Sequence, residues 1–129
     1  MNQKPILLAV DDDPRILRAL RLVLQREWDV VGVASTGEAL GLVALGLEPD
    51  AILIELDLAV ENGLLLMEEL PPRLQRRVVF TSHHGSTQRS RALDTTRALI
   101  LAKPIQLDTL EMAIEDTRMG RLRLDRLVA

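Results

Sequence analysis

The sequence predicts an α/β fold, a doubly wound parallel sheet of five strands with helices on both faces, written (βα)5. The first observation is that a short apolar segment is followed by a helical pattern five times in succession. The second is the apolar run at residues 51–54, which lies in a stretch bounded by turn residues and is typical of strands buried on both faces. Such alternation favours crossover connections between parallel strands, and 129 residues are most simply one domain.

The first strand is expected at residues 6–10 and ends in an acidic turn of three aspartates. Asp13 is a good N-cap, and Pro14 suits the first position of a helix. Apolar residues then recur at helical spacing as far as Leu24. The pattern therefore predicts a strand, an acidic turn and a helix in that order.

The second and third strands are expected at residues 30–34 and 51–55. Between them, Ser35 and Glu38 have the spacing of a capping box and open the second helix. Gly46 is expected to end this helix, because glycine readily adopts the left-handed conformation found after helices.

The third helix is expected at residues 64–70, where Pro71 and Pro72 stop it. A fourth strand at residues 78–80 precedes a polar helix over about residues 87–94. Since few apolar side chains anchor this fourth helix, we expect it to be the least firmly held. Its clear anchors are Ala92 and Leu93.

The fifth strand is expected at residues 98–102, directly before a Lys-Pro pair, and the last helix starts near Asp108. The arginine-rich tail that follows is expected to keep helical character. We therefore expect a domain at residues 1–118 and a helical extension or linker at residues 119–129.

Composition excludes several classes of function. The chain has no cysteine, which excludes disulfides and thiolate metal sites. Its formal charge is −3 and its aromatics are only Trp28 and Phe80, so direct nucleic-acid binding by this domain is not expected. No apolar run is long enough to span a membrane and no signal peptide is recognisable, so the cytoplasm is the expected location.

Polar side chains follow the ends of several strands, where open α/β sheets place their binding sites. If the first, third, fourth and fifth strands lie side by side, these side chains converge on one pocket. Clustered carboxylates suit a hard cation such as Mg²⁺, and a hydroxyl with a lysine suits a phosphoryl group. The side chains are those of Asp11, Asp12, Asp13, Glu55, Asp57, Thr81, Ser82 and Lys103.

The chain resembles the receiver domain of two-component response regulators over about residues 5–115. The segments that carry the resemblance are, in order, ILLAVDDDP, TGEAL, PDAILIELDLAVENG, VVFTS and LAKPI. The resemblance implies a flavodoxin-like strand order 2-1-3-4-5. It also implies a signalling module rather than an enzyme, with histidine kinases or output domains as partners. Homodimers would form through the fourth helix, fifth strand and fifth helix.

The resemblance also implies roles for individual residues. Asp11 and Asp12 match the acidic pair that binds Mg²⁺, with Asp12 the more direct ligand. Thr81 matches the hydroxyl that senses the phosphoryl group, and Lys103 matches the lysine that bridges to it. The bond before Pro104 is expected to be cis, as in the family.

Two departures from the family's pattern concern the chemistry. In the family, the phosphorylated aspartate stands six residues after the Pro of the Pro-Asp turn and eight before the Gly that ends the loop, and both counts arrive at Glu55. Asp57 then matches the position whose backbone carbonyl binds the metal. The family's aromatic switch residue is replaced by Ile100. The sequence therefore suggests a degenerate, phosphorylation-independent or phosphomimetic receiver, in which Glu55 faces Lys103.

Other readings stay open. In a shifted alignment, Asp57 would be the acceptor of a functional receiver that a histidine kinase phosphorylates with Mg²⁺. A nucleotide-binding flavodoxin-like domain is disfavoured, because no glycine-rich phosphate loop follows any strand. His83 and His84 are expected to be simply exposed.

Overall fold

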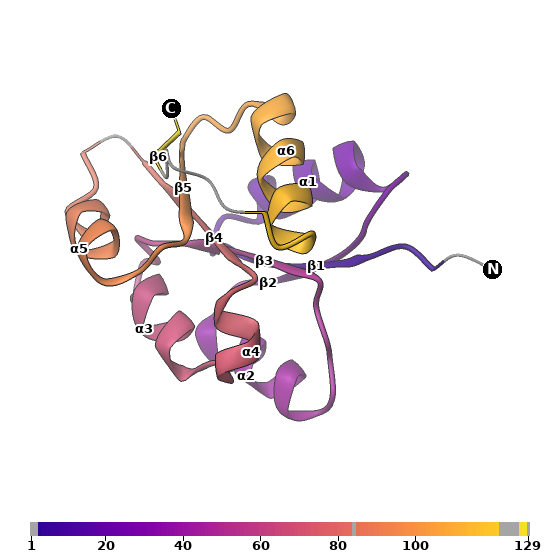
Figure 1. Ribbon diagram of the computed structural model, residues 1–129, viewed down its shortest axis with the longest axis horizontal. Helices are drawn as coiled ribbons and strands as arrows, with labels where there is room; N and C mark the ends of the chain where they lie inside the picture. Colours follow the sequence, from indigo (N-terminus) through magenta and orange to yellow (C-terminus); the bar gives the residue numbers. More distant parts are fainter. Residues whose placement is uncertain (1–2, 84, 122–126, 129) are drawn as a thin grey trace.

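The computed structural model describes residues 3–83, 85–121 and 127–128, and its centre is one parallel sheet (Figure 1). The strand order is β2-β1-β3-β4-β5-β6, and every neighbouring pair is parallel. The predicted order 2-1-3-4-5 is therefore confirmed, with one further strand at the outer edge of β5. The strands are β1 Ile6–Val10, β2 Asp29–Val33, β3 Ala51–Glu55, β4 Val78–Ser82, β5 Leu99–Ala102 and β6 Leu127–Val128.

Helices cover both faces of the sheet. Two of them, α1 and α6, lie together on one face, and the others lie on the opposite side (Figure 1). The alternation of side chains along β1 shows the same division, since Leu7 and Ala9 join the core under α1 and α6 while Leu8 and Val10 join the other core. The helices are α1 Pro14–Leu24, α2 Thr36–Ala44, α3 Gly63–Glu69, α4 Pro72–Gln75, α5 Gln88–Thr95 and α6 Leu107–Arg118.

The predicted helix ends are confirmed where capping residues set them. Asp13 accepts a hydrogen bond from the Arg15 amide at the start of α1. Ser35 accepts one from the Glu38 amide at the start of α2. Gly46 follows α2 with a φ of 108°, a left-handed conformation that favours glycine.

The prolines stop the third helix as predicted, since α3 ends at Glu69 directly before Leu70 and Pro71. The short helix α4 was not predicted, and Pro72 occupies its start, where a missing N–H has no cost. The prediction for the tail is wrong. The tail does not keep helical character at residues 127–128, which pair with Ile100 and Leu101 as β6. The helix α6 ends at Arg118 and is followed by Gly120 with a φ of 72°. Residues 122–126, on which part of the tail prediction falls, lie outside the described residues.

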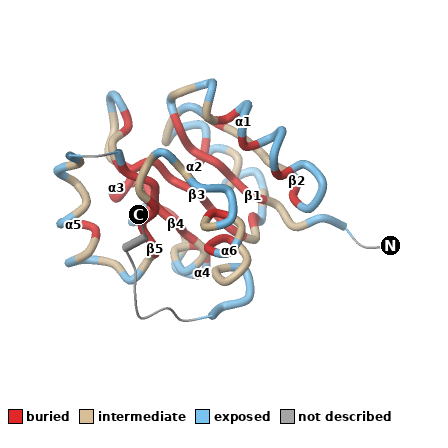
Figure 2. The backbone as a smooth tube through the Cα atoms, turned by 90° about the horizontal axis from the view of Figure 1, so that it is seen from above, coloured by how far each residue is buried: buried red, intermediate tan, exposed pale blue. Residues whose placement is uncertain are grey.

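Burial is concentrated in the strands, and the outward faces of the helices are exposed (Figure 2). The strands β3 and β4 are buried along their whole length. Helix α5 buries only Ala92 fully, with Leu93 partly buried against the core, which agrees with the sparse anchoring read from the sequence. Among the described helices, none combines the length and the apolar character that crossing a membrane requires.

Gly63 fixes the distance between the end of β3 and the start of α3. A Cβ at this position would lie 2.3 Å from the Glu55 carbonyl oxygen, so only glycine allows this approach. The Gly63 amide donates to the Leu56 carbonyl at 3.1 Å. The two ends of the loop from Leu56 to Gly63 are therefore held close together.

Candidate functional site

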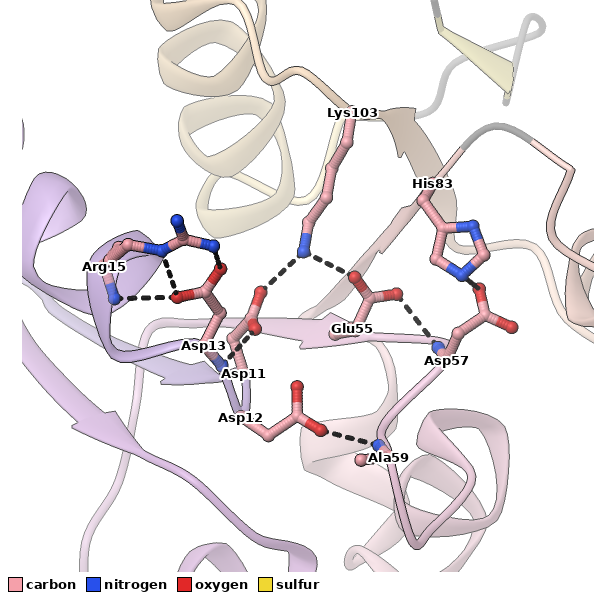
Figure 3. A network of polar contacts seen from close by, with 9 residues as sticks. All are labelled: Asp11, Asp12, Asp13, Arg15, Glu55, Asp57, Ala59, His83 and Lys103. Atoms are coloured by element: carbon pink, nitrogen blue, oxygen red, sulfur yellow. Dashed lines mark hydrogen bonds and ion pairs between the residues drawn. The ribbon is translucent and has the colours of Figure 1, made fainter.

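The ammonium group of Lys103 lies between two carboxylates at the carboxyl end of the sheet (Figure 3). Its Nζ is 2.8 Å from Asp11 Oδ2 and 2.5 Å from Glu55 Oε1. The Lys103 side chain is 20% exposed, whereas those of Asp11 and Glu55 are 6% and 4% exposed. The bond between Lys103 and Pro104 is cis, as expected. A buried ionic triad therefore joins the ends of β1, β3 and β5.

The ionic triad changes the pKa of its lysine. Burial by itself lowers the pKa of Lys103, and the hydrogen bonds and charges of Asp11 and Glu55 more than offset it, so that the pKa is raised. Lys103 is therefore a permanent cation at neutral pH, held in place by two carboxylates.

Glu55 is fixed through both of its carboxylate oxygens. While Oε1 meets Lys103, Oε2 accepts a hydrogen bond from the Asp57 amide at 2.9 Å (Figure 3). Thr81 lies opposite Glu55 in the register of β3 and β4, and it is 2% exposed. The structure thus brings Glu55, Thr81 and Lys103 to one place, as the sequence predicted.

The acidic turn after β1 is tied to the loop after β3. Asp12 Oδ2 accepts a hydrogen bond from the Ala59 amide at 2.6 Å, and Asp11 Oδ1 accepts one from the Asp13 amide at 2.9 Å (Figure 3). The contact with Ala59 was not predicted, because a backbone amide leaves no signal in the sequence. The carboxylates of Asp11 and Asp12 are therefore both engaged by donors of the protein itself.

The side chain of Asp57 faces the loop after β4. Its Oδ2 is buried, and His83 Nε2 lies 3.6 Å from it (Figure 3). His83 is 56% exposed, so the expectation of an exposed histidine holds, but its contact with Asp57 was missed. His84, for which exposure was also expected, lies outside the described residues.

Two further contacts hold the loop between β3 and α3. The carboxylate of Glu61 accepts hydrogen bonds from both the amide and the hydroxyl of Thr36, at the start of α2. Both hydrogen bonds lower the pKa of Glu61, and the one from the Thr36 hydroxyl has the larger effect. Asn62 caps α3 and also donates to Gln88 Oε1 at 3.0 Å. The loop is therefore attached to α2, α5 and the acidic turn.

The donors expected to bind Mg²⁺ do not form a vacant carboxylate cluster. Asp11 is paired with Lys103 and Asp12 with the Ala59 amide. Within the part of the chain that the structure describes, no three Asp, Glu or His side chains are grouped closely enough to hold a metal ion. As arranged, these residues fit a resident ammonium ion better than a divalent cation, which favours several unengaged oxygens.

The comparison with protein families decides the classification. The model of the response regulator receiver domain matches residues 7–115. The chain belongs to this family. Receiver domains are signalling modules that interact with histidine kinases and output domains, and they generally bind Mg²⁺ at the phosphorylation site. In this receiver domain, the acidic turn, Glu55, Thr81 and Lys103 lie together at the carboxyl end of the sheet.

Curated relatives are similar over most of this chain. The chain is 32% identical over 104 residues to the transcriptional regulatory protein KdpE of Mycobacterium tuberculosis, covering 80% of the chain and 46% of that protein. It is 30% identical over 128 residues to the nitrate/nitrite response regulator protein NarL of Escherichia coli, covering 95% and 59%. The chain therefore spans about half the length of these relatives.

Solved receiver structures share the fold. A response regulator from Chloroflexus aurantiacus matches with a TM-score of 0.77 and 25% identity, covering 91% of this chain and 99% of the other. The receiver domain of the Francisella response regulator 1452 matches with a TM-score of 0.76 and 22% identity, covering 91% and 98%. The latter likeness supports the fold alone.

Proposed function

We propose that this receiver domain signals without phosphorylation, with Glu55 at the position of the phosphorylated aspartate. The observation that carries the proposal is the double engagement of the Glu55 carboxylate by Lys103 Nζ at 2.5 Å and the Asp57 amide at 2.9 Å. In this arrangement the carboxylate acts as a standing negative charge, and the domain works through contacts with other proteins rather than as an enzyme.

The length of the side chain gives the chemical reason. Glutamate is one methylene longer than aspartate, so its carboxylate reaches the place where the phosphoryl group of an aspartyl phosphate would lie. Its oxygens are therefore displaced from the position of an attacking nucleophile, and in-line transfer is sensitive to errors of about 1 Å. Glu55 then resembles the phosphorylated side chain in charge and position but does not accept a phosphoryl group.

The switch residue supports the same proposal. Ile100 replaces the family's aromatic residue, is fully buried, and pairs with Phe80 in β4. A buried isoleucine cannot make the large ring movement by which an aromatic side chain reports phosphorylation. We infer that the domain holds one signalling state.

Mass spectrometry tests the proposal. The chain is incubated with acetyl phosphate and Mg²⁺, and its intact mass is measured. We expect no phosphoryl adduct for the natural chain and a stoichiometric adduct for Glu55→Asp, whose shorter side chain restores the position of the nucleophile. Asp57→Ala in the Glu55→Asp background is the control, and it should keep the adduct. A stoichiometric adduct on the natural chain would end the proposal.

Weak Mg²⁺ binding is part of the proposal. Asp11, Asp12 and the backbone carbonyl of Asp57 would be the ligands of a bound ion. Since Lys103 already neutralises Asp11, we expect calorimetry to detect no Mg²⁺ binding to the natural chain below millimolar concentrations. Tight binding by the natural chain would contradict this expectation.

Phosphorylation on Asp57 by a histidine kinase with Mg²⁺ is the second candidate. The observation that favours it is the buried Asp57 Oδ2, which accepts no hydrogen bond from the described residues. This candidate predicts an adduct that Asp57→Ala abolishes and Glu55→Gln leaves intact. The same mass measurement therefore separates the two candidates.

We further propose that the domain acts in the cytoplasm through a histidine kinase or an output domain, without binding nucleic acid or membrane itself. The expected contact face is formed by α5, β5 and α6, through which a homodimer would also form. In the structure, β6 lies along β5 in this face. Sedimentation velocity of the natural chain tests the homodimer, and a monomer at about 100 μM would contradict it, because a dissociation constant of about 1 mM corresponds to only about −4 kcal/mol of association.

A further inference from the structure

A cavity of about 710 Å³ lies at the end of the sheet opposite to the ionic triad. Its walls come from the ends of α4 and α6 and from the segment between α5 and β5. Leu99, the first residue of β5, lines it, whereas Lys103 follows the last residue of the same strand. The cavity is therefore separate from the receiver site.

The charged residues that line the cavity, among those the structure describes, are all arginines. Arg76, Arg97 and Arg121 line it from three different segments, and no carboxylate of the described residues lines it. This is unusual in a chain with 19 acidic and 16 basic residues. Arg121 pairs with Asp116 at 3.0 Å, but in the described part of the chain Arg76 and Arg97 form no ion pair. Arg76 and Arg97 are both exposed residues, so neither charge is enclosed by the protein at the edge of the cavity.

Helix dipoles account for only part of this charge. Arg76 directly follows α4, Arg97 lies shortly after α5, and Arg121 lies shortly after α6. All three arginines are therefore at the negative ends of helices. A helix end carries at most about half an elementary charge, and each guanidinium carries a full one. An excess of positive charge therefore remains in the cavity after the helix ends are compensated.

The other lining residues suit a ligand that has an organic part beside its charged group. Met67, Pro72 and Leu99 supply apolar surface beside the arginines. The volume falls in the range of about 300–1,000 Å³ that is usual for sites of small organic ligands. Guanidinium groups bind phosphate through paired hydrogen bonds and also stack on flat rings.

We propose that this cavity binds a small organic phosphate of the size of a nucleoside phosphate. The phosphate meets Arg76 and Arg97, and the organic part lies against Met67, Pro72 and Leu99. This site goes beyond the proposed function, because a ligand here requires neither Glu55 nor phosphorylation.

The test is an NMR titration of the full ¹⁵N-labelled chain with ADP. We expect saturable shifts of the amides of residues 95–99 and of Gly120, with little change at Asp11 or Lys103. Arg97→Gln should weaken binding by about tenfold, the effect expected when one charge-assisted contact is lost. The matched control is Arg26→Gln, an exposed arginine in the connection between α1 and β2, which should leave binding unchanged. Arg76→Gln serves as a second variant if Arg97→Gln does not fold.

Several outcomes would overturn the proposal. One is the absence of saturable shifts up to about 10 mM ADP, a range beyond specific binding of such ligands. A second is an equal loss of affinity in Arg26→Gln, which would indicate attraction to overall charge only. A third is that inorganic phosphate binds as tightly as ADP, because the organic part of ADP would then gain nothing from contact with Met67, Pro72 and Leu99.

Discussion

The two ends of the sheet deal with charge in opposite ways. At the carboxyl end, Lys103 lies between Asp11 and Glu55, and further donors engage Asp12 and Glu55. At the amino end of β5, arginines line an open cavity and two of them form no ion pair in the described structure. The first end is a closed network of partners, whereas the second leaves its charge available.

The two ends of the sheet also differ in how deeply their charged residues are buried. The side chains of Asp11 and Glu55 are 6% and 4% exposed, whereas Arg76 and Arg97 are on the surface. Removing one member of a buried ion pair leaves an uncompensated buried charge, and removing an exposed charge costs little. Substitutions should therefore destabilise the protein at one end of the sheet and affect only ligand binding at the other.

The largest effect is expected for Lys103→Met. This change leaves two buried carboxylates without a cation, and it should lower the free energy of unfolding by about 3–5 kcal/mol. Urea unfolding at neutral pH measures it. The control is Lys4→Met at the chain's other lysine, which is exposed and should change stability by about 0.5 kcal/mol or less.

The pH dependence gives an independent check of the same contact. In the folded state, burial lowers the pKa of Lys103, but the hydrogen bonds and charges of Asp11 and Glu55 outweigh this effect. The pKa of Lys103 is therefore raised. Its contribution to stability is complete below the unfolded pKa of about 10.4 and is lost as pH rises through the higher folded pKa. The difference in stability between the natural chain and Lys103→Met should therefore shrink in strong alkali. A difference that stays constant there, or is below about 1 kcal/mol at neutral pH, would exclude a stabilising triad.

A smaller and local effect is expected for Asp12→Ala. The variant loses the hydrogen bond from the Ala59 amide, so hydrogen exchange at this amide should speed up about tenfold, the value of a typical charge-assisted bond. Global stability should change little, because removing Asp12 also relieves repulsion with its acidic neighbours. Asp94→Ala, an exposed change on α5, is the control and should leave exchange at Ala59 unchanged. Unchanged exchange in Asp12→Ala would mean that the contact does not hold the loop.

Acid should weaken the attachment of the same loop to α2. Two hydrogen bonds from Thr36 lower the pKa of Glu61, and the one from the Thr36 side chain has the larger effect. The associated stability is present above the unfolded pKa of about 4.3 and is lost as pH falls through the lower folded pKa. Glu61→Gln should therefore lose less stability than the natural chain in acid, as measured by urea unfolding across this range. Glu27→Gln, an exposed glutamate before β2, should behave like the natural chain, and identical acid profiles for all three would contradict the prediction.

The sequence predicted the order of elements because each strand is an apolar run closed by turn residues. The end of β3 is an example, where apolar side chains give way to Glu55 and Asp57. Side chains with a strong local signal were also placed correctly, including the caps Asp13 and Ser35. The convergence of Glu55, Thr81 and Lys103 followed from the shared direction of parallel strands.

The remaining features depend on partners that are distant or carry no side-chain signal. The Ala59 amide could bind any acceptor, so its contact with Asp12 is set by how two loops meet. Leu127 and Val128 form β6 because the edge of β5 offers unpaired backbone groups, which a helical reading of the tail does not consider. The three arginines of the cavity are far apart in the sequence, and their grouping arises only through the packing of α4, α5 and α6.

The smallest effect is expected at the amino end of the sheet, where it separates a ligand site from simple helix stabilisation. Arg76→Gln and Arg97→Gln should each change the free energy of unfolding by about 0.5 kcal/mol or less, as exposed charges usually do. If these arginines served the helix ends alone, each change would cost up to about 1 kcal/mol and leave ADP binding unchanged. Urea unfolding of both variants, set beside their ADP titrations, distinguishes the two cases. Small losses of stability together with a large loss of ADP affinity would mean that the arginines are positioned for a ligand, whereas the reverse would reduce the cavity to a consequence of helix packing.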